Sequence, residues 1–364
     1  MMDTIYKKLL VIMVILALSH STTAQQKVTK RIENSFEMNG AGELQVNNEY
    51  GNITVRGWDQ NKVEIVIDIT ATGKKKENAE SLLERVIPDF KVMDNYVAVT
   101  SEIQAKKTGF IAKYFTNESP LDFSRSNLKI DYIIMLPSNA ELEINNKFGD
   151  VVIDGWAGNL KAIVAHGDIW INENIDNADI TIDYGKLKAR SVGYGNLRSK
   201  NGDITIDESR DLRINSRGTN IKIENVTTLD IHSNKDEITI GEIGSIEGEL
   251  KFTTALVKSV GNTINISTKV TDFKVSQFLK PNPVVFINQE SSDVSLNISG
   301  TSFVFDAVLE EGLLRIPKTF ENINSKMVND VKKIREIEAT YGKKMQGKVS
   351  LIGNKGVVVL KEQK

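Results

Sequence analysis

Cysteine is absent from the 364 residues of this sequence, and histidine occurs only three times. The chain therefore has no disulfide, no thiolate metal ligand, no cysteine nucleophile and no lipidated cysteine. The histidines, His20, His166 and His232, follow neither the His-x-His nor the His-Glu-x-x-His spacing of zinc sites. No Gly-x-Ser-x-Gly elbow, Walker loop or dinucleotide fingerprint occurs either. These absences predict a protein with no catalytic residue, no zinc site and no cofactor.

Long apolar runs are also missing beyond residue 18, so no later segment is expected to cross a membrane. The one such run, Leu9 to Leu18, follows Lys7 and Lys8 and precedes Thr22-Thr23-Ala24, which offers small residues for cleavage. An N-terminal anchor is the alternative, but the run is short for a hydrocarbon core of about 30 Å. We therefore predict a signal peptide over residues 1–24 and an exported chain, located in the periplasm, at the cell surface or outside the cell.

A strong charge of one sign is lacking as well. The chain carries 46 Lys and Arg against 48 Asp and Glu, a net charge of −2. Removing residues 1–24 takes away Asp3, Lys7 and Lys8, which leaves −3. Because nucleic-acid-binding proteins normally present a basic face, we expect no nucleic-acid partner.

What the sequence does contain is an internal repeat. A phrase that starts at Leu142 as Leu-Glu-Ile-Asn-Asn-Lys-Phe-Gly-Asp-Val-Val-Ile recurs to Ile316, and an earlier copy starts at Leu44. Each copy consists of two apolar segments separated by a short bend. We call anchor the residue that lies two positions before the first apolar residue of the second segment. The anchors recur every 17 to 21 residues, at Gly149, Gly167, Gly185, Gly202, Thr219, Asp236, Thr253, Thr271, Ser292 and Gly312. Such a period is typical of stacked repeats.

Apolar residues alternate on both sides of each anchor, which predicts two short strands that meet at a bend. Each rung can lay its strands beside those of the next, so that inward residues stack in aliphatic columns. The sequence thus predicts an all-β fold, a single-stranded parallel β-helix (β-solenoid) with about 17–18 residues per rung. We expect the anchor glycines to provide the positive φ of the bend, and Asp236 to substitute for them.

Departures from the repeat divide the chain into parts. We predict a signal peptide at 1–24, a first rung and N-terminal cap at 25–72, an inserted helix and strands at 73–140, the solenoid at 141–316, and an irregular segment with a closing rung at 317–364. The insertion contains helical spacing over Lys74 to Val86. The last part is lysine-rich, and its stretch Asn329 to Tyr341 fits both a helix and a strand.

Three sets of residues beside the anchors have expected structural roles. Aromatic residues directly before the anchors are expected to fill a corner, and Trp58 and Trp156 to pack under another. Polar residues three before the anchors are expected to form a hydrogen-bonded ladder. The first set is Tyr50, Phe148, His166, Tyr184 and Phe252, and the ladder set is Asn146, Ser199, Ser216, Ser233 and Thr268.

The outward positions of the coils are the candidates for a functional site. An acidic column directly after the anchors, together with positions +3 and +5, gives the candidate binding residues Asp150, Asp154, Asp168, Trp170, Asp203 and Asp207. Stacked carboxylates about 5 Å apart can bind Ca²⁺, which prefers oxygen ligands. Aspartate after glycine is also common turn chemistry. Both interpretations stay open, and no residue is assigned to a metal.

The sequence resembles the putative-adhesin β-solenoid family of bacterial exported proteins. The signal peptide, the recurrent Asn-x-x-Gly-Asp-[Ile/Val]-x-Ile phrase and the run Ile133 to Ile144 carry this resemblance. It implies a β-helix and an exported location, and it implies no activity. We therefore predict a non-enzymatic, adhesin-like binding or structural module that presents a rigid face to a polysaccharide or to an envelope or surface protein, in an oligomeric state left open.

Two alternatives come from other classes. One is a carbohydrate-active lyase or hydrolase on a β-helix, which needs converging carboxylates such as Asp154 and Asp207. The other is a component that senses or assembles the cell envelope.

Overall fold

The computed structural model describes residues 25–104, 127–344 and 346–362. These residues form strands almost throughout, and their one helix is α2 (Lys76–Glu84). With nine residues, this helix is too short to cross a membrane, and the described ranges contain no other candidate. The signal peptide predicted at residues 1–24 lies outside the described residues.

The chain divides into two compact units. In the smaller unit, α2 buries Ala79 and Leu82, which confirms the predicted helix with each end two residues shorter. Arg85 follows the helix, and its Nε donates a hydrogen bond to the carbonyl of Gln104 at 2.7 Å. The smaller unit takes its described residues from Met1–Arg31, Asp68–Ile87 and Glu102–Lys129, and the larger one from Ile32–Ile67, Pro88–Ser101 and Ile130–Lys364.

Seven strands precede the long repeat. In the larger unit, β6 pairs with β2 and β7 pairs with β3, both in parallel. The inserted strands therefore extend the stack of strands that the first copy of the repeat begins. The bounds are β1 (Gln26–Glu37), β2 (Glu43–Glu49), β3 (Ile53–Trp58), β4 (Lys62–Gly73), β5 (Val86–Met93), β6 (Tyr96–Ile103) and β7 (Leu128–Pro137).

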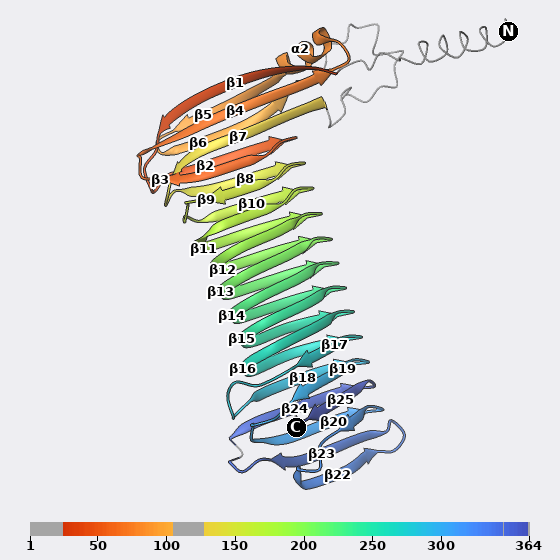
Figure 1. Cartoon of the computed structure of the whole chain (residues 1–364). Coiled ribbons are helices and arrows are strands. Elements are labelled where there is room, and N and C mark those ends of the chain that lie inside the picture. The colour runs from red at the N-terminus through yellow and green to blue at the C-terminus, as the bar shows by residue number, and fades with distance from the viewer. Residues whose placement is uncertain (1–24, 105–126, 345, 363–364) are drawn as a thin grey trace, which may run out of the picture. The chain divides into compact units, whose positions relative to one another are not determined.

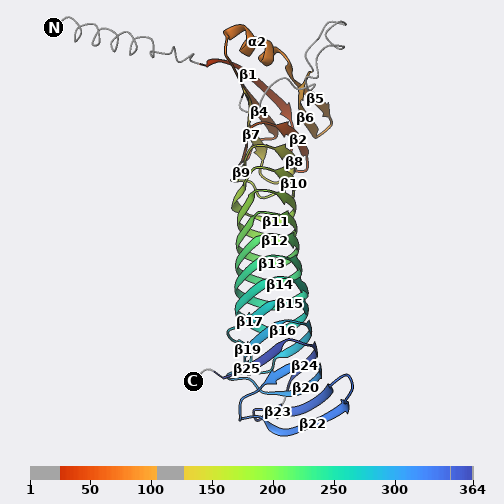
Figure 2. The same ribbon diagram turned by 90° about the vertical axis from the view of Figure 1, so that its right-hand side faces the viewer.

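From β8 onward, one coil of chain follows another along the larger unit (Figure 1, Figure 2). The strands of this part are β8 (Glu141–Lys147), β9 (Val151–Asp154), β10 (Leu160–Ala165), β11 (Ile169–Asp183), β12 (Lys186–Lys200), β13 (Asp203–Arg217), β14 (Asn220–Asn234), β15 (Glu237–Lys251), β16 (Thr254–Lys269), β17 (Asp272–Val275), β18 (Val284–Glu290) and β19 (Asp293–Asn297).

Each coil pairs in parallel with the next, and the register repeats the predicted spacing. Ile169 lies opposite Leu187, Leu187 opposite Ile204 and Ile204 opposite Ile221, which are offsets of 18, 17 and 17 residues. The two early copies of the phrase also pair directly, because Leu44 lies opposite Leu142. The prediction of an all-β fold with a mostly parallel sheet of consecutive strands is thus confirmed.

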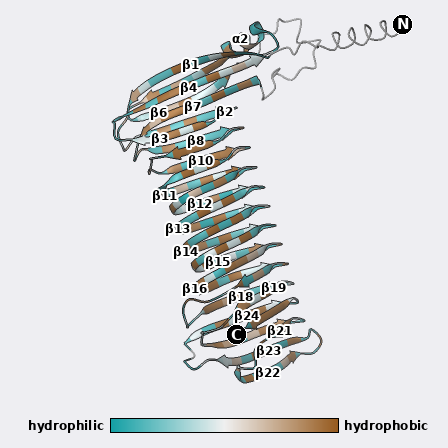
Figure 3. Cartoon of the chain, viewed as in Figure 1, coloured by the Kyte–Doolittle hydropathy of each residue, from teal (hydrophilic) through white to brown (hydrophobic). Residues whose placement is uncertain are grey.

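The core of the larger unit consists of aliphatic columns that run from coil to coil. Apolar and polar residues alternate along the strands (Figure 3). Burying one such side chain contributes about 1.5–3 kcal/mol. The column two residues after the anchors is buried at Ile53, Val151, Ile169, Leu187, Ile204, Ile221, Ile238, Ala255, Phe273 and Val294.

The anchor glycines have a different role from the predicted one. Positive φ occurs one residue earlier, for example at His166 (56°) and Tyr184 (57°), so the expectation is wrong for the anchor glycines up to Gly312. Gly356, in the last rung, does have positive φ (73°). The same holds for Asp236, because Lys235 has the positive φ in that coil. The glycines instead permit close stacking of the bends: a Cβ built on Gly167 would lie 1.9 Å from the carbonyl oxygen of Gly149.

The expected polar ladder beside the bends is confirmed. In the first coils, the side chain of Asn48 donates to Oδ1 of Asn146 at 3.2 Å. Further along, the hydroxyl groups of Ser216 and Ser233 donate to the carboxylate of Asp236 at 2.6 and 2.7 Å. The ladder satisfies most of the polar groups that are buried at these corners. Thr268 is an exception, because it is buried and its Oγ1 has no hydrogen-bond partner among the described residues.

Trp156 packs under a corner as predicted. Its ring is fully buried, and its Nε1 donates to the carbonyl of Ala140 at 3.1 Å. Trp58, at the matched position of the first copy, is half-buried and donates from Nε1 to the carbonyl of Lys62 at 2.8 Å.

The C-terminal strands do not stack in the order in which they occur in the chain. Strand β24 lies between β18 and β20, and β25 lies between β19 and β21, all in parallel. The rung that was expected to close the stack is therefore inserted one coil before its end. The strands are β20 (Phe303–Glu310), β21 (Leu313–Arg315), β22 (Glu321–Asn329), β23 (Ile334–Tyr341), β24 (Gly347–Asn354) and β25 (Val357–Lys361).

The segment that fitted both helix and strand forms strand β23. It runs antiparallel to β20 and to β22. Ile337, Ala339 and Tyr341 are buried, and the Tyr341 ring lies 5.2 Å from that of Phe303 and 5.1 Å from that of Phe320. Buried residues alternate along this segment with a period of two, which is the pattern of a strand and not of a helix.

Candidate functional site

The acidic column forms a hydrogen-bonded ladder between coils. Oδ1 of Asn52 accepts from the backbone N–H of Asp150 at 2.9 Å. Oδ1 of Asp150 accepts from the N–H of Asp168 at 2.9 Å, and Oδ1 of Asp168 from the N–H of Lys186 at 2.8 Å. These carboxylates therefore stabilise the bend of the next coil by accepting hydrogen bonds from its backbone. This supports the interpretation of the acidic column as turn chemistry. Within the described ranges, no three Asp, Glu or His side chains are grouped to hold a metal ion.

The other predicted site residues are spread over the face that follows the bends. Asp203 is half-buried and lies 3.7 Å from Lys186 Nζ. Trp170 is half-buried, with Val152 and Lys188 as its register partners. Asp154 and Asp207 are exposed and follow Ile153 and Ile206, which are three strands apart.

This spacing separates the two carboxylates by roughly three strand distances, about 14 Å. Glycosidase carboxylate pairs lie about 5–9.5 Å apart. The structure therefore does not bring Asp154 and Asp207 together as a catalytic pair, and none of the six predicted residues lines the groove that it does contain.

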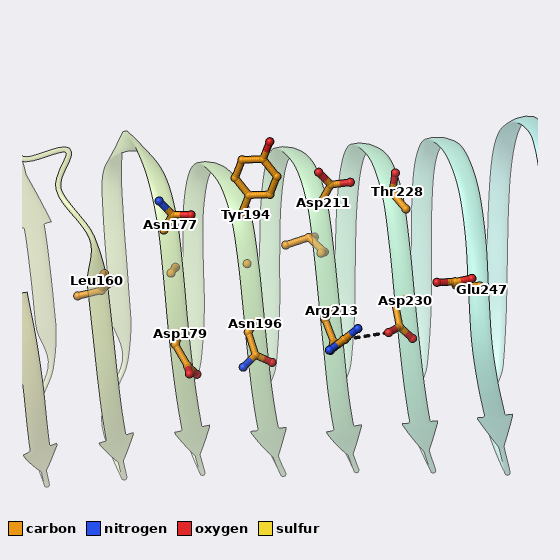
Figure 4. A pocket seen from close by; sticks show the side chains of 13 residues that line it. Leu160, Asn177, Asp179, Tyr194, Asn196, Asp211, Arg213, Thr228, Asp230 and Glu247 are labelled. Atoms are coloured by element: carbon orange, nitrogen blue, oxygen red, sulfur yellow. Dashed lines mark hydrogen bonds and ion pairs between the residues drawn. The ribbon is translucent and has the colours of Figure 1, made fainter.

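An open groove of about 570 Å³ crosses the face formed by the strand segments that precede the bends. Two outward rows of side chains, two residues apart on β11 to β15, form its walls (Figure 4). The first row is Asn177, Tyr194, Asp211 and Thr228. The second row is Asp179, Asn196, Arg213, Asp230 and Glu247.

The floor of the groove lies between the two outward rows, over an inward column that contains two small residues. Leu160, Ala178, Gly195 and Leu212 lie side by side in register, and all four line the groove. A Cβ on Gly195 would lie 2.6 Å from Cδ2 of Leu212, so the leucine uses the space above the glycine. The floor between the polar rows is therefore apolar.

Tyr194 is the aromatic wall of the groove. Its side chain is 48% exposed, and the guanidinium of Arg210 lies 5.1 Å from its ring centroid. Nη1 of Arg210 also donates to the Tyr194 hydroxyl at 2.9 Å, and this hydrogen bond raises the pKa of Arg210. A stacked cation contributes about 0.5–1 kcal/mol at an exposed site, so the ring is held in place from one side.

Ion pairs neutralise part of the second row. Nε of Arg213 lies 2.8 Å from Asp230, and Nη1 of Arg198 lies 2.7 Å from Asp179. Amides, a hydroxyl and paired charges then surround one aromatic ring. An arrangement of this kind offers many directional hydrogen bonds beside one apolar surface, which suits a ligand rich in hydroxyl groups.

The sequence contains a signal for this groove, but it lies before the anchors. The candidate residues predicted above occupy outward positions after the anchors. Seven residues before the anchors, most coils carry leucine or isoleucine, but Ala178 and Gly195 stand in two successive coils. Tyr194 directly precedes the glycine. Two small inward residues beside an outward aromatic residue thus coincide with the groove.

The aromatic residues before the anchors form a surface ladder and do not fill a corner of the core. Rings of Tyr50 and Phe148 are 5.6 Å apart, and the steps to His166 and then Tyr184 are 5.0 Å each, with interplanar angles of 14°, 14° and 8°. Tyr184 is 57% exposed. Because each of these residues has positive φ, its side chain projects outward from the bend.

No protein-family model and no curated protein sequence matches the chain. Solved structures do resemble it. A putative cell adhesion protein from Clostridium sporogenes has 13% identity and a TM-score of 0.21, with 92% of this chain and 100% of that one covered. Putative adhesins from Bacteroides fragilis and Parabacteroides merdae have 12% and 9% identity and TM-scores of 0.31 and 0.35, each with 91% of this chain and 97% of theirs covered. At these values the likeness identifies no family, ligand or activity.

Proposed function

We propose that the chain is a β-solenoid that acts as an exported, non-enzymatic, adhesin-like binding module. Parallel pairing of each coil with the next, at a nearly constant offset, supports the solenoid. Outward side chains then form straight rows along a rigid face, and such rows suit a ligand that is itself repetitive.

The ligand that the groove fits best is a polysaccharide. The observation that carries this proposal is the groove itself, in which exposed Tyr194 stands over an apolar floor between rows of amide, hydroxyl and carboxylate groups. The ring face can cover the C–H face of a sugar ring, while Asn177, Asn196 and Asp211 exchange hydrogen bonds with hydroxyl groups. The groove spans several coils, so it can hold several sugar units at once.

Replacing Tyr194 by alanine is expected to weaken binding at least about tenfold, because a buried aromatic contact of this kind contributes more than about 1.4 kcal/mol. A glycan array with the purified protein identifies the ligand, and isothermal titration then gives its Kd for each variant. Tyr194→Phe keeps the ring and loses only the hydrogen bond from Arg210, so its affinity should stay near the wild-type value.

Tyr184→Ala is the matched control, because Tyr184 is also an exposed tyrosine but belongs to the ladder at the bend. Equal losses for the two alanine variants would contradict the groove as the binding site. Cleavage of the bound glycan by the wild-type protein would overturn the non-enzymatic role.

A further inference from the structure

The C-terminal part of the chain carries a charge opposite to that of the rest. Residues 317–364 contain eleven Lys and Arg against five Asp and Glu, a net charge of +6, whereas the whole chain carries −2. The first 316 residues therefore carry −8. Within residues 321–341 four Lys and Arg balance four Asp and Glu, but residues 329–335 contain three Lys and Arg against one Asp. A basic cluster of this kind attracts anionic partners.

The basic part contains a hairpin that lies at one end of the stack (Figure 2). Strands β22 and β23 form it, and the turn between them contains Val331, Lys332 and Lys333. All nine residues of β22 are exposed. Among the described strands, β22 pairs only with β23, so one edge and both faces of β22 meet solvent.

Apolar residues are unusually exposed in this hairpin. Val331, at its tip, is 93% exposed, Ile323 is 54% exposed and Met327 is 38% exposed. Ser325 lies opposite buried Ile337, so Met327, two residues further along β22, shares the face that the core uses in the coils before. Leaving such side chains in water is unfavourable, which indicates that another surface covers them.

Basic groups adjoin these apolar side chains. Lys332 and Lys333 are exposed and follow Val331 directly, with one carboxylate, Asp330, before it. Arg335 lies opposite Met327, and its Nη1 donates to the Ser325 hydroxyl at 3.0 Å. Apolar tips next to lysine and arginine are the combination that proteins use at the headgroup boundary of a bilayer.

We propose that the β22–β23 hairpin binds the surface of an anionic lipid bilayer, with Val331, Ile323 and Met327 entering the headgroup region and the neighbouring basic groups contacting lipid phosphates. A polysaccharide would satisfy the charges but would offer hydroxyl groups to the aliphatic side chains. Pairing of β22 with a second copy is disfavoured by two register shifts along the strand. This inference is independent of the glycan groove.

Sedimentation with lipid vesicles tests the proposal. The purified protein should bind vesicles that contain phosphatidylglycerol and should not bind vesicles of phosphatidylcholine alone, and binding should weaken as salt is added. Reversing two charges in K332E/K333E should lower the partition coefficient about tenfold or more. V331S should lower it as well, and its fold is protected because the side chain is almost fully exposed.

Two variants serve as matched controls. K258E/K274E reverses the charge of two exposed lysines on the face that follows the bends, and I163S removes an exposed aliphatic group. Both should bind vesicles as the wild type does. Equal effects of the hairpin and control variants would overturn the proposal, as would equal binding to the two vesicle types. Binding to polygalacturonate with no vesicle binding would overturn the proposal in favour of a polysaccharide ligand. Dimers that K332E/K333E abolishes would overturn it in favour of self-association.

The absence of cysteine permits a second readout. A dye sensitive to polarity can be attached only at V331C, and its emission should shift to the blue on adding phosphatidylglycerol vesicles. The same dye at I163C should not shift. A shift at I163C and none at V331C would place the contact elsewhere and contradict the hairpin as the membrane-binding element.

Discussion

Gly167→Ala is expected to lower the free energy of unfolding by about 3 kcal/mol or more, although it adds a single methyl group. The new Cβ would lie 1.9 Å from the carbonyl oxygen of Gly149 and 2.6 Å from its carbonyl carbon. Both atoms belong to backbone, so the clash can be relieved only by separating two coils. Gly185 repeats the contact with Gly167, which spreads the strain to a third coil.

Urea denaturation followed by circular dichroism measures this change. Gly40→Ala is the control, because a Cβ there meets nothing closer than Cβ of Asn139 at 3.7 Å and should change stability by less than about 0.5 kcal/mol. A Gly167→Ala protein as stable as the control would show that the bends do not stack as closely as described.

Asp236→Ala is expected to destabilise the chain by about 3–5 kcal/mol. The carboxylate is 5% exposed and accepts from the hydroxyls of Ser216 and Ser233 and from the backbone N–H of Thr219 at 2.7 Å. Each buried donor left without an acceptor costs about 1–3 kcal/mol, and the three costs are not fully additive. Asp236→Asn keeps one acceptor oxygen and should have a smaller effect.

The control for this change is Asp272→Ala, which removes an exposed carboxylate from the position after an anchor. Its free energy of unfolding, from urea denaturation, should match that of the wild type within about 0.5 kcal/mol. Equal midpoints for the Asp236 and Asp272 variants would contradict the description of a buried polar ladder.

The repeat predicted the stack well because the physical rule is local. Inward positions must alternate along each strand, and identical columns require the same offset in each coil. The register offsets of 17 and 18 residues therefore follow from the sequence spacing between Gly167, Gly185, Gly202 and Thr219. The polar ladder follows in the same way, since buried polar residues at one phase need each other as partners.

The order of the coils near the C-terminus could not be predicted in this way. The rung around Gly356 has the same alternating apolar residues as the rungs around Ser292 and Gly312. Any two such rungs fit together, so spacing alone does not determine which are neighbours. The role of the glycines was missed for a related reason, because the approach of one bend to the next is a contact between coils.

The groove was missed because it depends on which outward residues lie side by side in neighbouring coils. Outward polar residues occur in every coil, and the sequence gives no reason to prefer one row to another. Ala178 and Gly195 both line the groove, and only the register shows that they are neighbours. The predicted residues Asp150 and Asp168 proved to be hydrogen-bonded in the bends, where a carboxylate after glycine has a local role.

The central claim is that side chains from successive coils form rows, and disulfide cross-linking tests it directly. Asn196 and Arg213 lie opposite each other on β12 and β13 and both line the groove. With their backbones about 4.8 Å apart, N196C/R213C should form a disulfide on mild oxidation. N196C/D230C, two coils apart at about 9.6 Å, should keep both thiols free. Bridging of the second pair and not of the first would contradict the stacked arrangement on which the groove depends.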